Sequence, residues 1–197
     1  MFAAEDMFRS FAPHRKNSIV IVTGTCGRHW RDISENEKRD APLAGAMGQT
    51  TSASLGLALA QPDEKVVLFD SEGSLLMNMG ILATIAGQKP NNFVHFLMDN
   101  ECYATTGGQP VPNSQDIDYA GMAREAGYSA AYSFDNLEEF TNNVEKIMNE
   151  PGPVFVAMKM VPEVENEPIG RRQRRAARPR VQAIRDLQES LGVPVSL

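Results

Sequence analysis

Cysteine is scarce in this chain, and long apolar runs are absent from it. Of its 197 residues only two are cysteines, and Cys26 and Cys102 lie far apart. Two cysteines are too few for a disulfide framework, and their spacing is not that of a zinc site, so we expect both thiols to be unbridged. No apolar run approaches the roughly 18 residues of a membrane-spanning helix. Residues 1–13 carry charged side chains where a signal peptide would be apolar, so we expect a cytoplasmic protein without membrane contact.

Acidic residues dominate the chain up to residue 170, and basic residues dominate the remainder. Residues 171–197 hold seven basic and two acidic side chains, against a net charge of -6 for the whole chain. The arginines could neutralise nucleic-acid phosphates, but no aromatic side chain is interleaved for stacking and the acidic body would repel a polyanion. We therefore expect no nucleic-acid partner. In the alternative interpretation these arginines tie a C-terminal arm to an acidic body or an acidic partner chain: Arg171, Arg172, Arg174, Arg175, Arg178 and Arg180.

Short β-rich segments alternate with helical ones along the chain, which is typical of an α/β protein with a mostly parallel sheet and helices on both faces. Strands are expected at residues 18–23, 65–70, 92–99, 130–133 and 153–160, and helices at 48–60, 74–87, 117–126, 137–149 and 181–191. We expect an α/β domain at 1–162, then an Arg-rich linker and helical arm at 163–197. Ligands of such sheets bind at the carboxyl ends of the strands, so the loops there should converge.

The loop after the second expected strand carries a carboxylate in the first turn of a helix, in the run Asp70-Ser71-Glu72-Gly73-Ser74. Backbone N–H groups at a helix N-terminus favour an anion such as phosphate, and a carboxylate there adds an oxygen ligand for Mg²⁺. The third strand ends at Asn100, 28 positions after Glu72, and the amide oxygen of Asn100 also suits a hard cation. An ordinary Ser-Glu-Gly helix cap would look similar, and the turn alone does not separate the two interpretations.

The two strand ends together resemble the Gly-Asp-Gly…Asn motif of the diphosphate-binding domain of thiamine diphosphate enzymes. Here the run is Ser71-Glu72-Gly73, with 26 residues between Gly73 and Asn100. The likeness extends to residues 45–48, 52–60, 74–86 and 105–110, and spans about residues 18–160. Among these enzymes the chain is most similar to the sulfopyruvate decarboxylase β chains and the matching half of the phosphonopyruvate decarboxylases.

The resemblance implies a set of cofactor and metal contacts. Glu72, the Asn100 side chain and the Cys102 carbonyl would bind Mg²⁺, and the Gly73 N–H and Ser74 hydroxyl would hold the diphosphate. Further thiamine diphosphate contacts would come from Thr25, Gly45, Met47 and Tyr103. Met47 would wedge between the two cofactor rings and bend the cofactor, while the Gly45 carbonyl accepts from the aminopyrimidine. A methionine at this place could also simply belong to the core.

The chain departs from the family motif where Glu72 replaces Asp and Ser71 replaces Gly. One additional methylene displaces the carboxylate, whereas Mg²⁺ requires near-octahedral geometry at about 2.0 to 2.1 Å. Backbone compensation, acceptance of a larger ion and loss of affinity are the three outcomes, and we favour compensation. Arg28 and His29, in the loop expected after the first strand, could bind an anionic substrate or could be ordinary surface side chains. The loop at 103–113 could form a mobile lid.

The family's activating glutamate lies on a separate pyrimidine-binding domain, and we find no such domain in this sequence. The resemblance therefore implies a hetero-oligomer in which a partner subunit supplies that domain and glutamate. The expected activity is decarboxylation of a small anionic 2-oxoacid, such as a 3-sulfo- or 3-phosphonopyruvate. A carboligase with the same cofactor and a non-catalytic scaffold subunit are the alternatives. An NAD-dependent dehydrogenase is disfavoured, because no G-x-G-x-x-G opens any expected helix.

Overall fold

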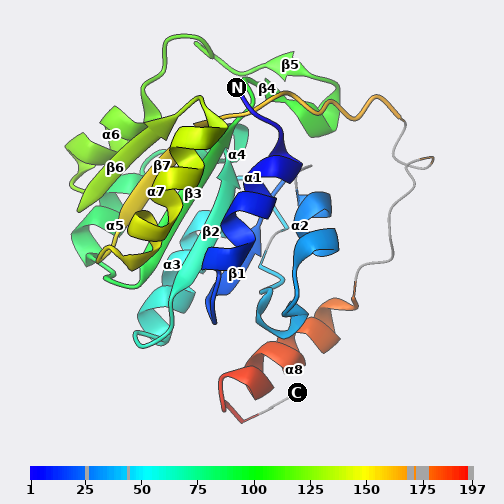
Figure 1. The fold of residues 1–197 in the computed structure, drawn as a ribbon, viewed down its shortest axis with the longest axis vertical. Coiled ribbons are helices and arrows are strands. Elements are labelled where there is room, and N and C mark those ends of the chain that lie inside the picture. Colours follow the sequence, from blue (N-terminus) through cyan, green and yellow to red (C-terminus); the bar gives the residue numbers. More distant parts are fainter. Residues whose placement is uncertain (25–26, 44, 168–170, 172–177, 195–197) are drawn as a thin grey trace.

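A parallel β-sheet forms the centre of the protein. The computed structural model describes residues 1–24, 27–43, 45–167, 171 and 178–194. The five strands pair in the order β1-β2-β3-β7-β6, and every pair is parallel (Figure 1). They are β1 (Ile19–Val22), β2 (Val66–Ser71), β3 (Phe93–Asp99), β6 (Ala130–Phe134) and β7 (Val154–Lys159). The α/β class expected from the sequence is confirmed, because helices cover both faces of this sheet.

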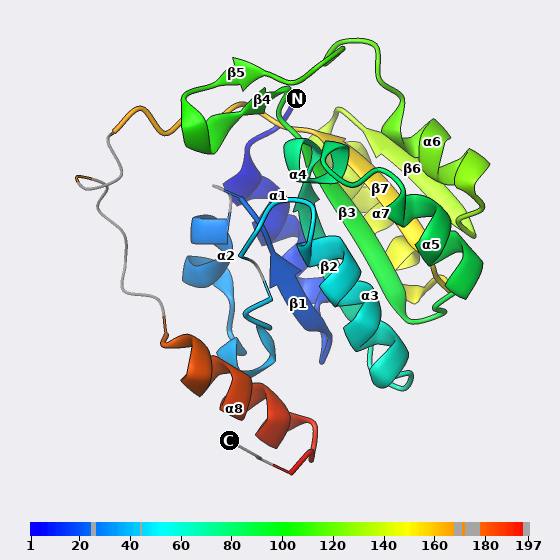
Figure 2. The ribbon, with the colours of Figure 1, turned by 180° about the vertical axis from the view of Figure 1, so that it is seen from behind.

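The two faces of the sheet have different helical covers because side chains alternate along each strand. Val67 and Phe69 of β2 face α1 (Ala4–Phe11) and α7 (Leu137–Asn149). Val66 and Leu68 face the other layer, which consists of α3 (Thr50–Ala60), α5 (Ile81–Gln88) and α6 (Tyr119–Ala126). Figure 2 shows α3 and α5 on the side of the sheet opposite α1. Buried on both faces, the strands have the apolar runs that predicted them.

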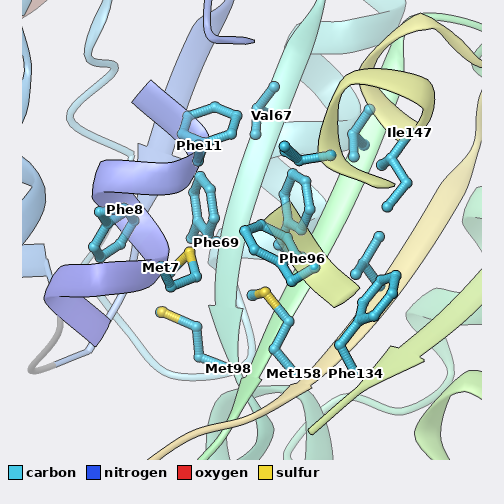
Figure 3. Packing of buried hydrophobic residues seen from close by; sticks show 14 of the residues in the cluster. Met7, Phe8, Phe11, Val67, Phe69, Phe96, Met98, Phe134, Ile147 and Met158 are labelled. Carbon is cyan, nitrogen blue, oxygen red and sulfur yellow. The ribbon is translucent and has the colours of Figure 1, made fainter. Parts of the chain in front are cut away.

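Helix α1 was not predicted, yet it contributes large side chains to one of the two cores. Phe8 and Phe11 both lie 4.9 Å, centroid to centroid, from the ring of Phe69, and Phe69 stacks on Phe96 at 4.8 Å (Figure 3). The apolar positions of α1, among them Met7, recur at helical spacing and lie on its inner face. Residues 1–13 therefore belong to the α/β domain as an integral helix.

Three further segments differ from the sequence-based expectation. The loop expected at residues 24–30 contains the start of α2 (Gly27–Ile33). The single helix expected at 74–87 is divided into α4 (Glu72–Leu76) and α5, with Gly80 just before α5. The segment 103–113 contains a short hairpin of β4 (Cys102–Tyr103) and β5 (Gln109–Pro110), with η3 (Ala104–Thr106) between its strands. Helical periodicity cannot reveal such short elements, because each covers two turns or fewer.

The C-terminal arm ends in α8 (Arg180–Ser190), which packs near η2 (Glu37–Arg39) with Ala183 and Leu187 buried. Arg178 pairs with Asp186 and donates to the carbonyl of Glu37. For Arg178, the interpretation in which arginines fix the arm to the body is supported. Arg172, Arg174 and Arg175 lie outside the described residues. No helix in the described ranges is long and apolar enough to cross a membrane.

Candidate functional site

The carboxyl ends of β2 and β3 bring Glu72 and Asn100 together. The backbone N–H of Cys102 lies 3.1 Å from Glu72 Oε1 and 3.2 Å from Asn100 Oδ1, so both oxygens accept from one donor. Both side chains are buried. The residue opposite Cys102 in the hairpin is Pro110, which has no N–H to offer its carbonyl. A carboxylate oxygen, an amide oxygen and the Cys102 backbone thus meet at one edge of the sheet.

The second carboxylate oxygen of Glu72, Oε2, differs from the first in its hydrogen bonding. Oε2 is buried and has no hydrogen-bond partner among the described residues. Burial first, and the charge of Asp99 second, raise the pKa of Glu72 to about 7, although backbone N–H groups at Glu72, Asn100 and Cys102 act in the opposite direction. Leaving a buried acceptor unsatisfied costs about 1–3 kcal/mol, and more when it is charged. A cation at Oε2 would remove this penalty.

The neighbouring carboxylates at this edge share an ion pair with one lysine. Lys159, at the end of β7, lies 2.8 Å from Asp99 Oδ2 and 3.0 Å from Glu101 Oε1. Burial raises the pKa of Asp99, and the hydrogen bond from Lys159 and its charge oppose that rise. Asp99 and Lys159 are direct neighbours in the parallel register of β3 and β7. Glu72 is therefore the carboxylate of this edge whose charge has no cation beside it among the described residues.

The segment that follows Glu72 is closely packed against the hairpin. A Cβ on Gly73 would lie 2.7 Å from Cε1 of Tyr103, so this position accepts only glycine unless the ring moves. The same Cβ would lie 3.5 Å from the terminal methyl of Met47. Met47 is 46% exposed, so the alternative that it merely belongs to the core is wrong. Gly73, Tyr103 and Met47 are thus brought together beside Glu72.

Ser74 connects this segment to the loop at 45–48. Its Oγ accepts from the N–H of Gly48 at 3.1 Å, and the side chain of Asn78 donates to the Gly48 carbonyl at 2.9 Å. Because Ser74 accepts in this contact, its own hydroxyl proton remains to be donated. Gly45 is exposed, and a Cβ there would lie 3.9 Å from the guanidinium of Arg180. Thr25, another expected cofactor contact, lies outside the described residues.

Asp70, which precedes the turn, belongs to a buried network that the sequence did not predict. Its carboxylate accepts from the Thr51 hydroxyl at 2.5 Å and from the Ser71 N–H at 2.9 Å, and His95 Nε2 lies 3.6 Å from Oδ2. Burial alone would raise the pKa of Asp70, but the adjacent His95, followed by the hydrogen bonds from Thr51 and Ser71, holds it below its ordinary value. Asp70 thereby fixes β2 to β3 and α3.

Tyr119 of α6 is a second residue that the sequence did not single out. It is buried, and its hydroxyl has no hydrogen-bond partner among the described residues. Burial first, then the charges of Asp99 and Glu72 and the nearby Tyr103, raise the pKa of Tyr119. The position of Tyr119 near the start of an expected helix does not indicate a role at the site. Only the fold brings α6 up to the ends of β2 and β3.

Arg28 and His29, which the sequence offered as anion contacts, already share a carboxylate. The guanidinium of Arg28 pairs with Glu163, and His29 Nε2 lies 2.8 Å from Oε2 and 3.0 Å from Oε1 of that residue. Glu163 follows β7 by a few residues and was not singled out in the sequence. Arg28 is exposed at the surface and His29 is half-buried, and both are paired with Glu163 rather than with solvent alone.

The donor set at Glu72 and Asn100 fits a hard cation that also binds phosphate. In the described ranges no cluster of three or more His, Cys, Asp or Glu side chains could hold a metal by itself. Mg²⁺ commonly binds through one or two carboxylates together with phosphate oxygens and water, without an all-protein cage. The unpartnered Oε2 of Glu72 and the amide oxygen of Asn100 agree with that mode.

Comparison with known proteins supports this interpretation. Residues 23–158 match the thiamine pyrophosphate enzyme, C-terminal TPP binding domain. The sulfopyruvate decarboxylase subunit beta of Methanothermobacter thermautotrophicus is 38% identical over 135 residues, which cover 66% of this chain and 69% of that protein. The phosphonopyruvate decarboxylase of Streptomyces hygroscopicus is 33% identical over 145 residues.

The fold is likewise similar to that of solved enzymes of this kind. Benzoylformate decarboxylase from Polynucleobacter necessarius superposes with a TM-score of 0.70 over 82% of this chain, at 16% sequence identity. The present chain spans 33% of that enzyme and 36% of the Streptomyces protein. It thus corresponds to about a third of each of these longer enzymes.

Proposed function

The chain belongs to the thiamine pyrophosphate enzymes through their C-terminal TPP-binding domain, and from this premise we propose that it is the diphosphate-binding subunit of a two-chain 2-oxoacid decarboxylase. The observation that carries the proposal is the pair of oxygens from Glu72 and Asn100 on one N–H, with Glu72 Oε2 buried and unpartnered beside them. Relatives named as beta subunits of sulfopyruvate decarboxylase support both the reaction class and the presence of a second chain.

In this proposal Glu72, the Asn100 side chain and the Cys102 carbonyl hold Mg²⁺. Of the three outcomes open for Glu in place of Asp, compensation is favoured, because the longer Glu72 side chain still reaches the N–H that Asn100 also uses. A divalent ion next to Glu72 would stabilise its ionised form and lower its raised pKa. The protein ligands are few, so the ion and the diphosphate should bind together.

The cofactor contacts follow the arrangement around Gly73. The Gly73 N–H and the Ser74 hydroxyl donate to diphosphate oxygens, and the exposed side chain of Met47 supports the bend between the cofactor rings. Tyr103 packs against Gly73 and limits the space beside the diphosphate. Two further contacts, the Gly45 carbonyl and Thr25, complete the proposed set.

When bound, thiamine diphosphate supplies the carbanion chemistry and electron sink for loss of carbon dioxide from a 2-oxoacid. The residues of this chain bind and orient. Glu72 and Asn100 fix the charged end, Lys159 neutralises Asp99 so that Glu72 faces the ion with less competing negative charge, and Tyr103 with Met47 excludes water from one side. Such preorganised electrostatics cost no rearrangement during the reaction.

The partner subunit is proposed to supply the pyrimidine-binding domain and the activating glutamate. Support comes from the Streptomyces enzyme, of which this chain covers 36%, so that most of that enzyme has no counterpart here. The substrate is proposed to be a small anionic 2-oxoacid of the sulfopyruvate or phosphonopyruvate type. A cytoplasmic location is also proposed, and the free thiol of Cys102 supports it.

Calorimetry tests the proposal with the full chain and its candidate partner. Thiamine diphosphate and Mg²⁺ should release heat together and much less when either is added alone. Asn100→Ala and Glu72→Gln should each weaken cofactor binding about 100-fold, which is the effect of one lost contact to a charged group. Asn142→Ala and Glu125→Gln, exposed changes of the same chemistry on α7 and α6, should leave it unaltered. Undiminished binding by Asn100→Ala would reject that residue as a metal ligand.

A scaffold subunit is the second candidate function, favoured by the altered turn at Ser71 and Glu72. The same titration separates the candidates, because a scaffold would bind the partner and give no cofactor heat at millimolar concentration. A carboligase would bind the cofactor in the same way and differ in its product. Product analysis with a 2-oxoacid alone and with a second aldehyde or oxoacid distinguishes the carboligase from the decarboxylase.

A further inference from the structure

The side chains of Arg28 and His29 both bind the carboxylate of Glu163. His29 Nε2 is within 3.0 Å of both oxygens of Glu163, and Arg28 pairs with the same group. The Glu163 side chain is 19% exposed and that of His29 is 21% exposed, whereas the Arg28 side chain is 48% exposed, so the carboxylate is half-buried and reached by solvent from the Arg28 side. A guanidinium and an imidazole around one carboxylate form an oxyanion-binding pair. Because the group that they bind is a carboxylate, carboxylates are the class of ligand that fits this pair.

This pair lies at the edge of the sheet that carries Glu72. Gly24, which follows β1, lies beside Ser71, because a Cβ on Gly24 would be 3.8 Å from the Cβ of Ser71. The segment with Glu163, which we call the strap (residues 161–167), starts beside Asp99, whose carbonyl accepts from the Met160 N–H at 2.8 Å. Figure 1 shows the strap leaving β7 and passing beside the β4–β5 hairpin. Gly24, four residues before Arg28, and Met160, three residues before Glu163, thus both contact strand ends that border the proposed cofactor site.

The strap is anchored independently of Glu163. The N–H of Glu165 donates to the Ala104 carbonyl at 2.9 Å, and Val164 lies so close to Gly108 that a Cβ there would be 3.0 Å from it. Gly108 has a φ of 80°, a conformation that glycine adopts without strain. A rotation about the side-chain bonds of Glu163 would release Arg28 and His29 without moving the strap backbone. The carboxylate can thus be exchanged for another at little structural cost.

We propose that Arg28 and His29 are the subsite for the carboxylate of the 2-oxoacid substrate, and that Glu163 occupies it as an internal surrogate until substrate displaces it. The identity of the ligand as substrate rests on the proposed function. Being tethered, Glu163 competes at an effective concentration in the millimolar range or above. The surrogate keeps the two side chains in position, and it excludes anions that bind more weakly than the substrate.

The test follows the imidazole resonance of His29 by NMR in the full chain. The chain has three histidines, so the His29→Asn spectrum assigns this resonance. Titration with 3-sulfopyruvate should shift it, and Glu163→Gln should lower the dissociation constant at least fivefold because the competitor is gone. Arg28→Gln in the Glu163→Gln background should raise the dissociation constant at least tenfold. Asp63→Asn, which removes an equal charge from the exposed loop before β2, should behave as the wild type.

Each result decides the proposal. Unchanged affinity in Glu163→Gln, or in the additional Arg28→Gln variant, would overturn it. Inorganic pyrophosphate is titrated in parallel, and if Glu163→Gln tightens pyrophosphate and not 3-sulfopyruvate, the pair serves the cofactor and the substrate assignment is wrong. Calorimetry with thiamine diphosphate and Mg²⁺ reports separately on the proposed function. Its failure in every variant would refute the cofactor role, while the order of affinities for sulfopyruvate, and for pyruvate, which has the carboxylate and no sulfonate, would still decide whether the pair receives a carboxylate.

Discussion

Asp70 and Glu72 are two buried carboxylates only two residues apart, and their surroundings differ in kind. Asp70 accepts from Thr51 and from the Ser71 N–H and lies near His95, and these contacts hold its pKa below the ordinary value. Glu72 has one oxygen bonded to the Cys102 N–H and one oxygen with no partner among the described residues, and its pKa is raised to about 7.

This contrast separates a carboxylate that holds the fold from one that awaits a ligand. Asp70 faces the helical layer of α3, where protein groups satisfy it completely enough to keep it ionised. Glu72 begins α4 at the sheet edge, where the chain supplies one donor and leaves the remaining capacity open. An orphaned buried charge lowers stability, so its presence in a folded protein points to a partner that is not part of the chain.

The largest expected effect is loss of the Asp70 network. Asp70→Ala leaves the Thr51 hydroxyl and the Ser71 N–H without their acceptor, and each buried unsatisfied group costs about 1–3 kcal/mol. We expect unfolding free energy, measured by urea denaturation, to fall by about 3 kcal/mol or more. Asp70→Asn, which keeps one acceptor oxygen, should lose less. Equal losses in both variants would contradict the contrast between Asp70 and Glu72, because the acceptor oxygen kept in Asp70→Asn would then contribute nothing to stability.

The next effect is a pH dependence caused by Glu72 in the metal-free chain. Its pKa is raised from 4.5 to about 7 by folding, so ionising it disfavours the native state. The protonated form keeps its full stability below about pH 4.5, and stability falls as pH rises toward and through 7. The total loss is about 3 kcal/mol, at about 1.4 kcal/mol per pKa unit.

Glu72→Gln isolates this contribution. The variant should match the wild type near pH 4 and exceed it by up to about 3 kcal/mol near pH 8, because a neutral amide removes the buried charge. Urea denaturation at several pH values between 4 and 8 measures the difference. A constant difference across that range would show that Glu72 does not titrate in the native state, and the contrast with Asp70 would disappear.

A smaller effect concerns the packing next to Glu72. Gly73→Ala places a methyl group 2.7 Å from Cε1 of Tyr103, so the ring or the turn has to move. We expect a loss of about 2 kcal/mol in unfolding free energy, as for overpacking elsewhere. Tyr103→Ala in the same chain should restore most of this loss relative to Tyr103→Ala alone. A purely additive double-mutant cycle would contradict the contact.

The smallest effect is expected at Tyr119, which shares the unsatisfied character of Glu72. Tyr119→Phe removes a buried hydroxyl without a partner among the described residues, so thermal denaturation should show a gain of up to about 1 kcal/mol. Tyr132→Phe is the matched control, because the Tyr132 hydroxyl donates to Glu150 at 2.7 Å and its removal should cost stability. Opposite signs for the two variants would sharpen the comparison, and equal losses would contradict it.

Much of the fold followed from apolar periodicity. The five strands of the main sheet and the helices α3, α6, α7 and α8 were all predicted, because each combines a continuous or regularly spaced apolar run with turn residues at its ends. Helix α1 was not predicted, although Phe8 and Phe11 follow a helical pattern, because eight residues are a short window for apolar periodicity. The short α2 and the β4–β5 hairpin gave no periodic signal.

The candidate site was predicted only as far as consecutive residues and motif spacing allow. Glu72, Gly73 and Asn100 stood out because a polar group at the end of an apolar strand is unusual and two such ends came at a familiar spacing. The pairing of Arg28 with Glu163, 135 positions away, left no local trace. The buried Tyr119 also left no trace in the sequence, because its lack of a hydrogen-bond partner among the described residues depends on the segments that pack around it.

The sequence by itself determined the layered α/β architecture and the strand ends at which chemistry is expected, because alternation along a strand and the polarity of its ends are local properties. Only the tertiary structure decided which buried polar groups find partners. That outcome depends on contacts between segments far apart in the chain, through which Asp70 is satisfied by α3 and β3 while one oxygen of Glu72 is left for a ligand.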